Sequence, residues 1–206
     1  MIFSRISVVF PNFSPQKWRF MQEKTQGVVL RTLKYNDNSL IVDIYTAIRG
    51  TVSFMVKLPK SRKAALKGVF FRPLSILEID FDYRQKSALQ RIRDVRFKYV
   101  YQTLPYDPRK SSMALFLAEF LCRVLKHEEG SDTLFSYILY SLQWLDASGE
   151  GFSNFHLVFL TRLTRFLGFY PNVEEWHKGD CFDMVEACFV SSSPSRHAYL
   201  EPQEAA

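Results

Sequence analysis

Apolar and polar residues alternate with a period close to two between Thr25 and Val100, the spacing of β-strands that bury one face. The alternation predicts five strands, over residues 25–33, 40–46, 51–56, 77–83 and 87–95. The first turns are short and contain Asn, Asp or Gly, and no helical period interrupts the segment. Parallel strands need long crossover connections, so this meander predicts a small closed antiparallel barrel, with the OB-fold as the leading candidate.

The period changes to that of α-helices beyond Pro105. Capping residues predict that three helices begin at Asp107 and Pro108, at Ser131 or Asp132, and at Ser153 or Asn154. We expect these helices to bury three apolar stripes: Met113, Leu117, Phe120 and Val124, flanked by Phe116 and Leu121; Leu134, Ile138, Leu142 and Leu145; and Phe155, Phe159, Leu160, Leu163 and Leu167. Helices this short must pack on one another to bury such stripes.

The order of the two periods predicts an α+β fold, in which a five-stranded OB-fold barrel precedes a helical domain. We expect an extension outside the fold over residues 1–20, the OB-fold domain over 21–102, the helical domain over 103–170, and a small Cys-containing region over 171–206. The last six residues resemble the first turn of a helix, which predicts that the chain is truncated.

The composition indicates a globular protein of a reducing compartment. Of the 206 residues 47% are apolar, enough to bury a sizeable core. Cys122, Cys181 and Cys188 form an odd set without a secretory signal, so we expect free thiols and a cytoplasmic location. The basic character of residues 1–20 leaves a transit peptide as an alternative. No apolar stretch approaches the ~20 residues of a membrane-spanning helix, which excludes a membrane protein.

The charges are divided unevenly along the chain. Residues 1–110 carry 21 Lys and Arg against 8 Asp and Glu, a net charge of +13, whereas residues 111–206 carry 6 against 13, a net charge of −7. A solvated basic surface would account for scattered cations, but a half-chain this basic favours binding to a polyanion such as nucleic acid.

A basic loop between two predicted strands is the main candidate for this binding. The candidate phosphate contacts are Lys57, Lys60, Arg62, Lys63 and Lys67 of the loop, together with Arg91 and Arg93 of the last strand, which Arg96 and Lys98 extend. Such contacts give affinity that is independent of sequence and falls steeply with salt. Phe70, Phe71, Tyr35 and Tyr45 are candidates for base stacking. The alternatives are a mobile solvated loop and aromatic residues that belong to the core.

The chain contains no phosphate-binding loop for ATP and no H-E-x-x-H or G-x-S-x-G motif, so we predict no catalytic residue and no cofactor. Glu78, Asp80 and Asp82 share one face of a strand, where they would hold the metals of a nuclease or simply form its solvated face. His177, Cys181, Cys188 and His197 are ligand types for zinc but lack any C-x-x-C spacing. Packing of the cysteines as small apolar residues is the alternative.

Two segments resemble the RecO family, namely residues 24–42, which begin KTQGVVLR and continue through YNDNSLIV, and residues 167–173, LGFYPNV. The resemblance covers residues 21 to about 190. It implies a recombination mediator that binds single- and double-stranded DNA and anneals complementary strands. It also implies association with RecR and an indirect action on RecA. The mediator recognises the acidic tail of single-strand-binding protein and helps RecA to displace that protein from DNA. Arg162 and Arg165 of the third helix are our candidates for binding the tail.

The sequence departs from the family at one site. Many members carry a four-cysteine zinc site after the LGFYP segment, whereas Trp176 and Gly179 stand here at the positions of the first C-x-x-C. We therefore expect no metal and predict apolar packing around Trp176, Phe182 and Phe189 instead. A general RNA-binding OB-fold module, a nuclease and a protein adaptor without DNA affinity remain as competing interpretations.

Overall fold

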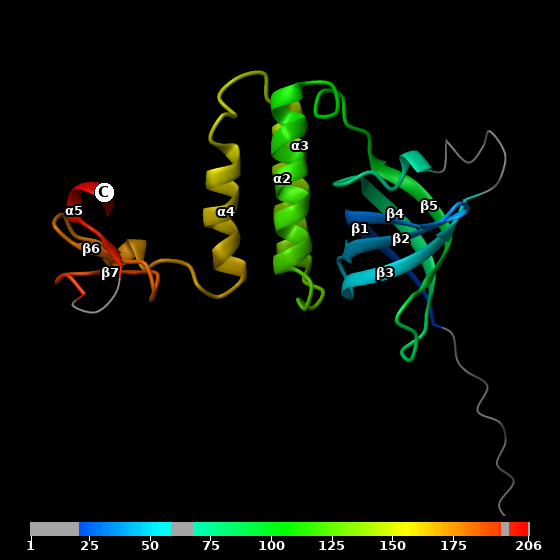
Figure 1. The fold of residues 1–206 in the computed structure, drawn as a ribbon, viewed down its shortest axis with the longest axis horizontal. Helices are drawn as coiled ribbons and strands as arrows, with labels where there is room; N and C mark the ends of the chain where they lie inside the picture. The colour runs from blue at the N-terminus through cyan, green and yellow to red at the C-terminus, as the bar shows by residue number, and fades with distance from the viewer. Residues whose placement is uncertain (1–20, 59–67, 195–197, 206) are drawn as a thin grey trace, which may run out of the picture.

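The alternating segment folds into a five-stranded antiparallel sheet in the computed structural model, which describes residues 21–58, 68–194 and 198–205 (Figure 1). The strands are β1 (Met21–Asn36), β2 (Ser39–Thr46), β3 (Gly50–Lys57), β4 (Ile76–Tyr83) and β5 (Arg91–Tyr99). All five predicted strands are confirmed, although β5 begins at Arg91 rather than at Ser87. The amide of Gln90 donates to the carbonyls of Arg84 and Ser87, which holds these residues in a turn.

The sheet is not closed into a barrel, and the expectation of full closure is wrong. In the order β3-β2-β1-β4-β5, no ladder joins the two edge strands within the described residues, and an isolated bridge links Phe54 of β3 to Gln90, the residue before β5. Met55 N donates to Gln90 O at 2.9 Å, and Gln90 N donates to Ser53 O at 2.9 Å. Beyond this bridge, residues 91–95 pair with β4 and the end of β3 pairs with β2, and the free edges of the two strands line a cavity of about 350 Å³. The α+β class with an N-terminal OB-type sheet is confirmed.

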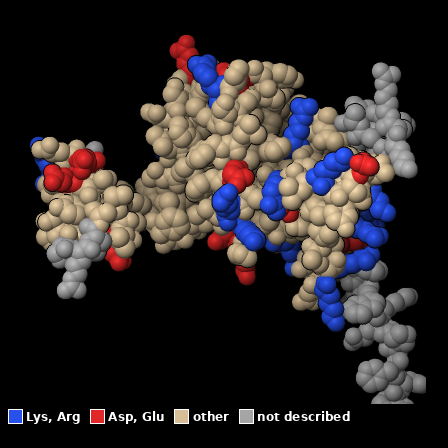
Figure 2. All heavy atoms as spheres, viewed as in Figure 1, with Lys and Arg blue, Asp and Glu red and all other residues tan. Residues whose placement is uncertain are grey.

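Three helices follow the sheet: α2 (Pro108–Val124), α3 (Asp132–Ala147) and α4 (Phe155–Phe166). The Asp107 carboxylate accepts from Arg109 N at 2.8 Å, and the Ser131 hydroxyl accepts from Leu134 N at 3.3 Å, so both predicted caps are confirmed. Asn154 precedes α4 without a side-chain cap. A small sheet of order β7-β6-β8 comes last, with the elements η1 (Val173–Glu175), β6 (Cys181–Asp183), β7 (Cys188–Val190), β8 (Tyr199–Leu200) and α5 (Pro202–Ala205). Lys and Arg gather over the first sheet on the face shown in Figure 2.

Two apolar cores organise the larger part of the molecule. One lies within the first sheet, where Phe54 and Phe81 pack edge to face at 5.2 Å. The other joins the sheet to the helices, because it contains residues of β1, β2 and β4 together with residues of α2, α3 and α4. The stripes of α3 and α4 are buried as predicted at Leu134, Ile138, Leu142, Leu145, Phe155, Phe159 and Leu163.

The apolar stripe predicted for α2 is confirmed in part, because Leu117 and Leu121 are buried and Met113, Phe120 and Val124 pack partly buried against the core. Its buried apolar residues are Ala114, Leu117, Ala118 and Leu121, whereas Phe116 is 48% exposed. Ala114 and Ala118 complete the buried face, and Phe116 lies outside it. Phe116 then packs against Phe120 of the same helix and against His156 of α4, with ring centroids 6.4 and 6.1 Å apart.

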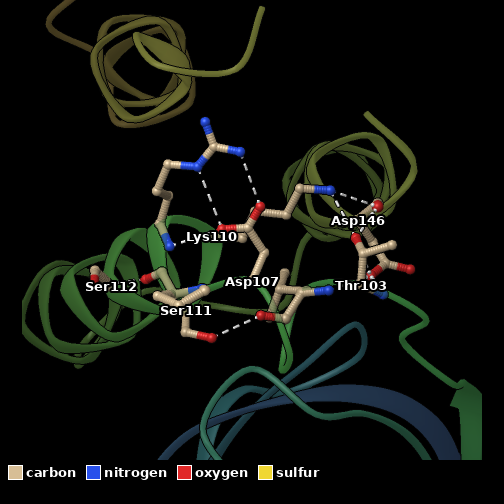
Figure 3. A network of polar contacts seen from close by, with 9 residues as sticks. Thr103, Asp107, Lys110, Ser111, Ser112 and Asp146 are labelled. Atoms are coloured by element: carbon tan, nitrogen blue, oxygen red, sulfur yellow. Dashed lines mark hydrogen bonds and ion pairs between the residues drawn. The ribbon is translucent and has the colours of Figure 1, made fainter. Parts of the chain in front are cut away.

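The connection between β5 and α2 is fastened to the end of α3 by Asp146, which is 1% exposed (Figure 3). Its carboxylate accepts hydrogen bonds of 2.7 to 3.2 Å from the backbone N–H groups of residues 102–104 and one of 2.9 Å from the Tyr99 hydroxyl. Lys110, 2% exposed, donates from Nζ to Thr103 Oγ1 at 2.6 Å and to the Asp146 carbonyl at 2.8 Å. These contacts fix the sheet relative to the helices, because they satisfy buried polar groups that come from both.

A second junction joins the β2–β3 turn to the loop between α2 and α3. Gly50 has a φ of +66°, and a Cβ atom placed on it would lie 2.0 Å from Glu128 O. A Cβ atom on Gly130 would lie 2.4 Å from the carbonyl carbon of Ile48. The two backbones therefore approach as closely as glycine alone permits.

Candidate nucleic-acid interface

The outer face of β1, β4 and β5 carries charges that are matched across strands. Glu78 on β4 pairs with Lys24 on β1 at 3.1 Å and with Arg96 on β5 at 2.7 Å. Hydrogen bonds from Lys24 and Arg96 lower the pKa of the Glu78 carboxyl below its usual value. This carboxylate is therefore held as an anion between two cations.

The other two acids of this strand are also engaged. Asp82 pairs with Arg93 at 2.7 Å, and Asp80 accepts from Gln22 Nε2 at 2.9 Å. Across residues 21–58, 68–194 and 198–205, no cluster of three or more His, Cys, Asp or Glu side chains is arranged to hold a metal ion. The nuclease interpretation of Glu78, Asp80 and Asp82 thus has no metal cluster to support it in the described parts of the chain.

Three of the predicted phosphate contacts come together at the unpaired edges of β3 and β5. Lys57, Arg91 and Arg93 line the same cavity, beside one acid, Asp94, and aromatic residues from the segment before β4. Within the described residues, Lys57 and Arg91 have no ion-pair partner, whereas Arg93 is paired with Asp82. The other four predicted contacts, Lys60, Arg62, Lys63 and Lys67, lie outside the described residues.

The four aromatic candidates for base stacking have different environments. Tyr45 and Phe71 are buried in the two cores, which agrees with the alternative interpretation of these rings as core residues. Burial raises the pKa of Tyr45 to about 12, and its hydroxyl donates to Glu129 O at 3.3 Å. Phe70 lies at the cavity and stacks on Phe97 with ring centroids 4.5 Å apart, and Tyr35 is 62% exposed. Phe70 and Phe71 both line the cavity beside the cations, and Phe70 is the less buried of the two.

A second concave surface, the helical groove, lies between α3 and α4 and has a volume of about 580 Å³. It is lined by Tyr137, Tyr140, Ser141, Trp144, Gly151, Asn154, Phe155, Val158, Phe159 and Arg162. Trp144 is 52% exposed and stacks on Phe155 at 5.7 Å, and Tyr137 donates to Phe159 O at 2.8 Å. Arg162 supplies the single charge of this lining. The groove thus offers aromatic surface beside one cation.

Arg162, a predicted tail contact, lines the helical groove, whereas the aromatic side of this groove was not predicted from the sequence. Tyr137, Tyr140 and Trp144 recur at helical spacing on α3, beside the buried leucine stripe, and this second stripe was the available signal. Arg165, the other predicted tail contact, does not line the groove. Its guanidinium lies over the Tyr170 ring at 4.3 Å and 3.9 Å from Glu174, so it contacts the C-terminal region instead.

The C-terminal region contains the aromatic cluster that was predicted in place of a zinc site. The rings of Phe182 and Phe189 are 5.0 Å apart, and Trp176 meets Phe189 at 6.4 Å. Trp176 remains 38% exposed, so it covers the cluster rather than forming its centre. The described cysteines are free thiols, with Cys181 buried and Cys188 partly buried. Of the four proposed zinc ligands, His197 lies outside the described residues.

The helices of the described residues include none that is both long and apolar enough to cross a membrane. The family described as Recombination protein O N terminal matches residues 21–101, and Recombination protein O C terminal matches residues 105–203. The chain is 55% identical to the DNA repair protein RecO of Phocaeicola vulgatus over 90% of this chain and 77% of that protein. It is 49% identical to RecO of Bacteroides fragilis over 90% and 77%, and 39% identical to RecO of Flavobacterium johnsoniae over 82% and 71%. The chain therefore belongs to the RecO family of DNA repair proteins.

Proposed function

We propose that this protein acts as a recombination mediator, without covalent chemistry, by holding DNA strands on its sheet and single-strand-binding protein on its helices. The observation that supports DNA binding most directly is that Lys57, Arg91 and Arg93 lie together at the unpaired edges of β3 and β5. Cations on a sheet edge contact phosphates, and Phe70 beside them offers a ring for a base. We propose that the protein works on chromosomal DNA in the cytoplasm, at the nucleoid.

Annealing of complementary strands requires only that their mutual repulsion be screened. Each cation that neutralises a phosphate releases a condensed counterion, so weak contacts of this kind bind any sequence and let the strands shift into register. Lys57 and Arg91 suit this role because no carboxylate in the described residues pairs with them, whereas Arg93 must share its charge with Asp82. We extend the proposed surface to Lys60, Arg62, Lys63 and Lys67 on the strength of the sequence.

A strand-annealing assay with a salt titration tests this part of the proposal. We expect Lys57→Glu with Arg91→Glu to slow annealing and to reduce the slope of log affinity against log salt by roughly one for each phosphate that is no longer neutralised. Lys126→Glu with Lys178→Glu is the matched control, because it makes the same charge change on two exposed residues that do not line the cavity. An unchanged slope in the double variant would remove these residues from the interface. Equal annealing of RNA strands would instead favour the general RNA-binding module.

We further propose that the helical groove receives the acidic tail of single-strand-binding protein. A tail with apolar residues beside carboxylates matches an aromatic groove that has Arg162 as its charge. The proposal is based on Arg162 rather than on Arg165, because Arg165 is occupied by Tyr170 and Glu174.

Two substitutions on one helix separate these assignments. We expect Arg162→Glu to weaken binding of a fluorescent tail peptide about tenfold, which corresponds to ~1.4 kcal/mol, and Arg165→Glu to weaken it much less. Fluorescence anisotropy measures both. Equal effects of the two variants would mean that long-range charge, and not the groove, attracts the peptide.

Association with RecR and assistance to RecA complete the proposed role. They rest on the family alone, because no described surface can be assigned to either partner by its chemistry. Loading of RecA onto DNA coated by single-strand-binding protein, with and without RecR, measures both contributions. A protein adaptor would bind RecR yet fail to retain DNA at physiological salt.

A further inference from the structure

A third concave surface lies where the sheet meets the helices, on the connection between β5 and α2. This junction groove has a volume of about 370 Å³, within the range of roughly 300–1,000 Å³ that is typical of ligand sites. Four of its lining residues are large apolar side chains that remain exposed, namely Val69, Val100, Tyr106 and Leu115. Tyr106 is 80% exposed and Leu115 is 63% exposed. Apolar side chains grouped in this way indicate an interaction site more strongly than single ones do.

Three of the hydroxyl groups that line the junction groove already donate hydrogen bonds within the protein. The Tyr101 hydroxyl donates to Leu74 O at 2.8 Å, and the Tyr99 hydroxyl donates to Asp146 at 2.9 Å. The Ser111 hydroxyl donates to Leu104 O at 2.9 Å. The floor of the groove therefore presents ring and aliphatic surface, and an occupant gains from it chiefly by burying apolar atoms.

One unpaired cation gives the junction groove its charge preference. Arg72 lines the groove, no carboxylate does so, and no ion pair joins Arg72 to another described residue. We propose that this groove binds an acidic peptide segment of a partner protein. The apolar side chains of the peptide would rest on Val100, Tyr106 and Leu115, and a carboxylate beside them would pair with Arg72.

A peptide fits the junction groove better than a nucleic-acid strand does. Binding of DNA is dominated by phosphates and requires several cations in a row, but this lining contributes a single one. The cavity between β3 and β5, by contrast, is lined by Lys57, Arg91 and Arg93. These two surfaces thus differ in the ratio of cations to apolar area, and the junction groove, like the helical groove, combines broad apolar contact with one charge.

The test uses the full chain and a short fluorescein-labelled peptide in which phenylalanine and leucine stand among aspartates. A second peptide with lysines in place of the aspartates is the charge control. Because the helical groove also has an arginine, binding is measured both in the native chain and in an Arg162→Glu, Val158→Ser variant. We expect the acidic peptide to bind this variant, and Arg72→Glu or Leu115→Ser added to it to weaken the binding about tenfold.

Matched substitutions distinguish the junction groove from general surface effects. Leu157→Ser changes an equally exposed leucine on α4, and Lys178→Glu makes a comparable charge change far along the chain; neither residue lines either groove. Both should leave peptide binding unchanged, and thermal unfolding verifies that every variant is folded.

Three results would overturn the proposal. The first is loss of all peptide binding in the Arg162→Glu, Val158→Ser variant. This result would mean that the peptide binds at the helical groove, as proposed for the tail, and that the junction groove has no ligand. The second is equal binding of the lysine peptide. The third is an Arg72→Glu variant that loses affinity for oligothymidylate but not for the peptide, which would make the junction groove part of the DNA surface.

Discussion

At the scale of single residues, Asp146 shows what the sequence alone could not indicate. Near the end of a helix it resembles any solvated acid. It is buried, however, and the backbone N–H groups that donate to its carboxylate lie more than 40 residues away along the chain. Lys110 likewise occupies a buried position on α2 that the apolar pattern would have assigned to solvent. Both depend on how the connection after β5 meets two helices, which no local pattern encodes.

We predict that Asp146→Asn destabilises the protein by about 3 kcal/mol, because the amide places a donor against backbone N–H groups that need an acceptor. Burial by itself raises the pKa of the Asp146 carboxyl, but the N–H donors of residues 102–104 and the Tyr99 hydroxyl hold it below its usual value of 3.8. A lowered pKa means that the stabilisation is present above about pH 4 and is lost as the pH falls further. Urea unfolding between pH 3 and pH 7 measures the free energy of unfolding at each pH. For the Asn variant this free energy should fall less steeply as the pH is lowered. A dependence on pH equal to that of the native protein would contradict the prediction.

The glycines at the second junction give another prediction at this scale. We expect Gly50→Ala to destabilise the protein by about 3 kcal/mol, because the new methyl group would overlap the Glu128 carbonyl and the residue has a positive φ. Gly149→Ala is the control, since no atom lies within 4 Å of its added Cβ, and it should be neutral or slightly stabilising. Denaturant midpoints compare the two; equal effects would mean that the β2–β3 turn can move away from the loop.

At the scale of elements, the pattern predicted the strands and the helix starts because local alternation and capping residues determine them. It predicted the face that α2 buries only in part: Leu117 and Leu121 are buried, but the pattern did not indicate that Ala114 and Ala118 share that face. The strands β6, β7 and β8 are two or three residues long, which is too short for any period to register. Of the DNA-binding candidates, Lys57, Arg91 and Arg93 lie together, but the pattern could not foresee that Arg93 pairs with Asp82.

The C-terminal region provides a prediction about metal. We expect the purified chain to contain no stoichiometric zinc and chelation to leave its fold unchanged, because an indole at position 176 cannot serve as a ligand. Since Trp176 is 38% exposed, Trp176→Ala should cost about 1–2 kcal/mol, less than the roughly 3–5 kcal/mol expected for a fully buried ring. Elemental analysis and thermal unfolding test the two statements. One zinc per chain, lost on substitution of Cys181 or Cys188, would refute the first.

At the scale of the whole molecule, cations gather over the first sheet on the face shown in Figure 2, and this sheet belongs to the half of the sequence that is rich in Lys and Arg. The division into an OB-fold domain over 21–102 and a helical domain over 103–170 stays a prediction. The core that joins them is continuous, and it unites Tyr45 of the sheet with Leu117 of α2 and Phe135 of α3. Tyr45 and Phe135 stack with ring centroids 6.5 Å apart. Sheet and helices therefore depend on each other for burial.

We predict that the sheet and the three helices unfold in one cooperative transition. Leu117→Ala removes a fully buried side chain from the joining core and should cost about 3 kcal/mol. If the core couples the sheet to the helices, Leu117→Ala will lower the opening free energy of the slowest-exchanging amides of β1 and of α3 by the same amount. Native-state hydrogen exchange measures both values. Leu157→Ala, on the exposed face of α4, should change neither set. A loss confined to α3, with β1 still protected, would mean that the OB-type sheet is stable alone and that the domains are independent.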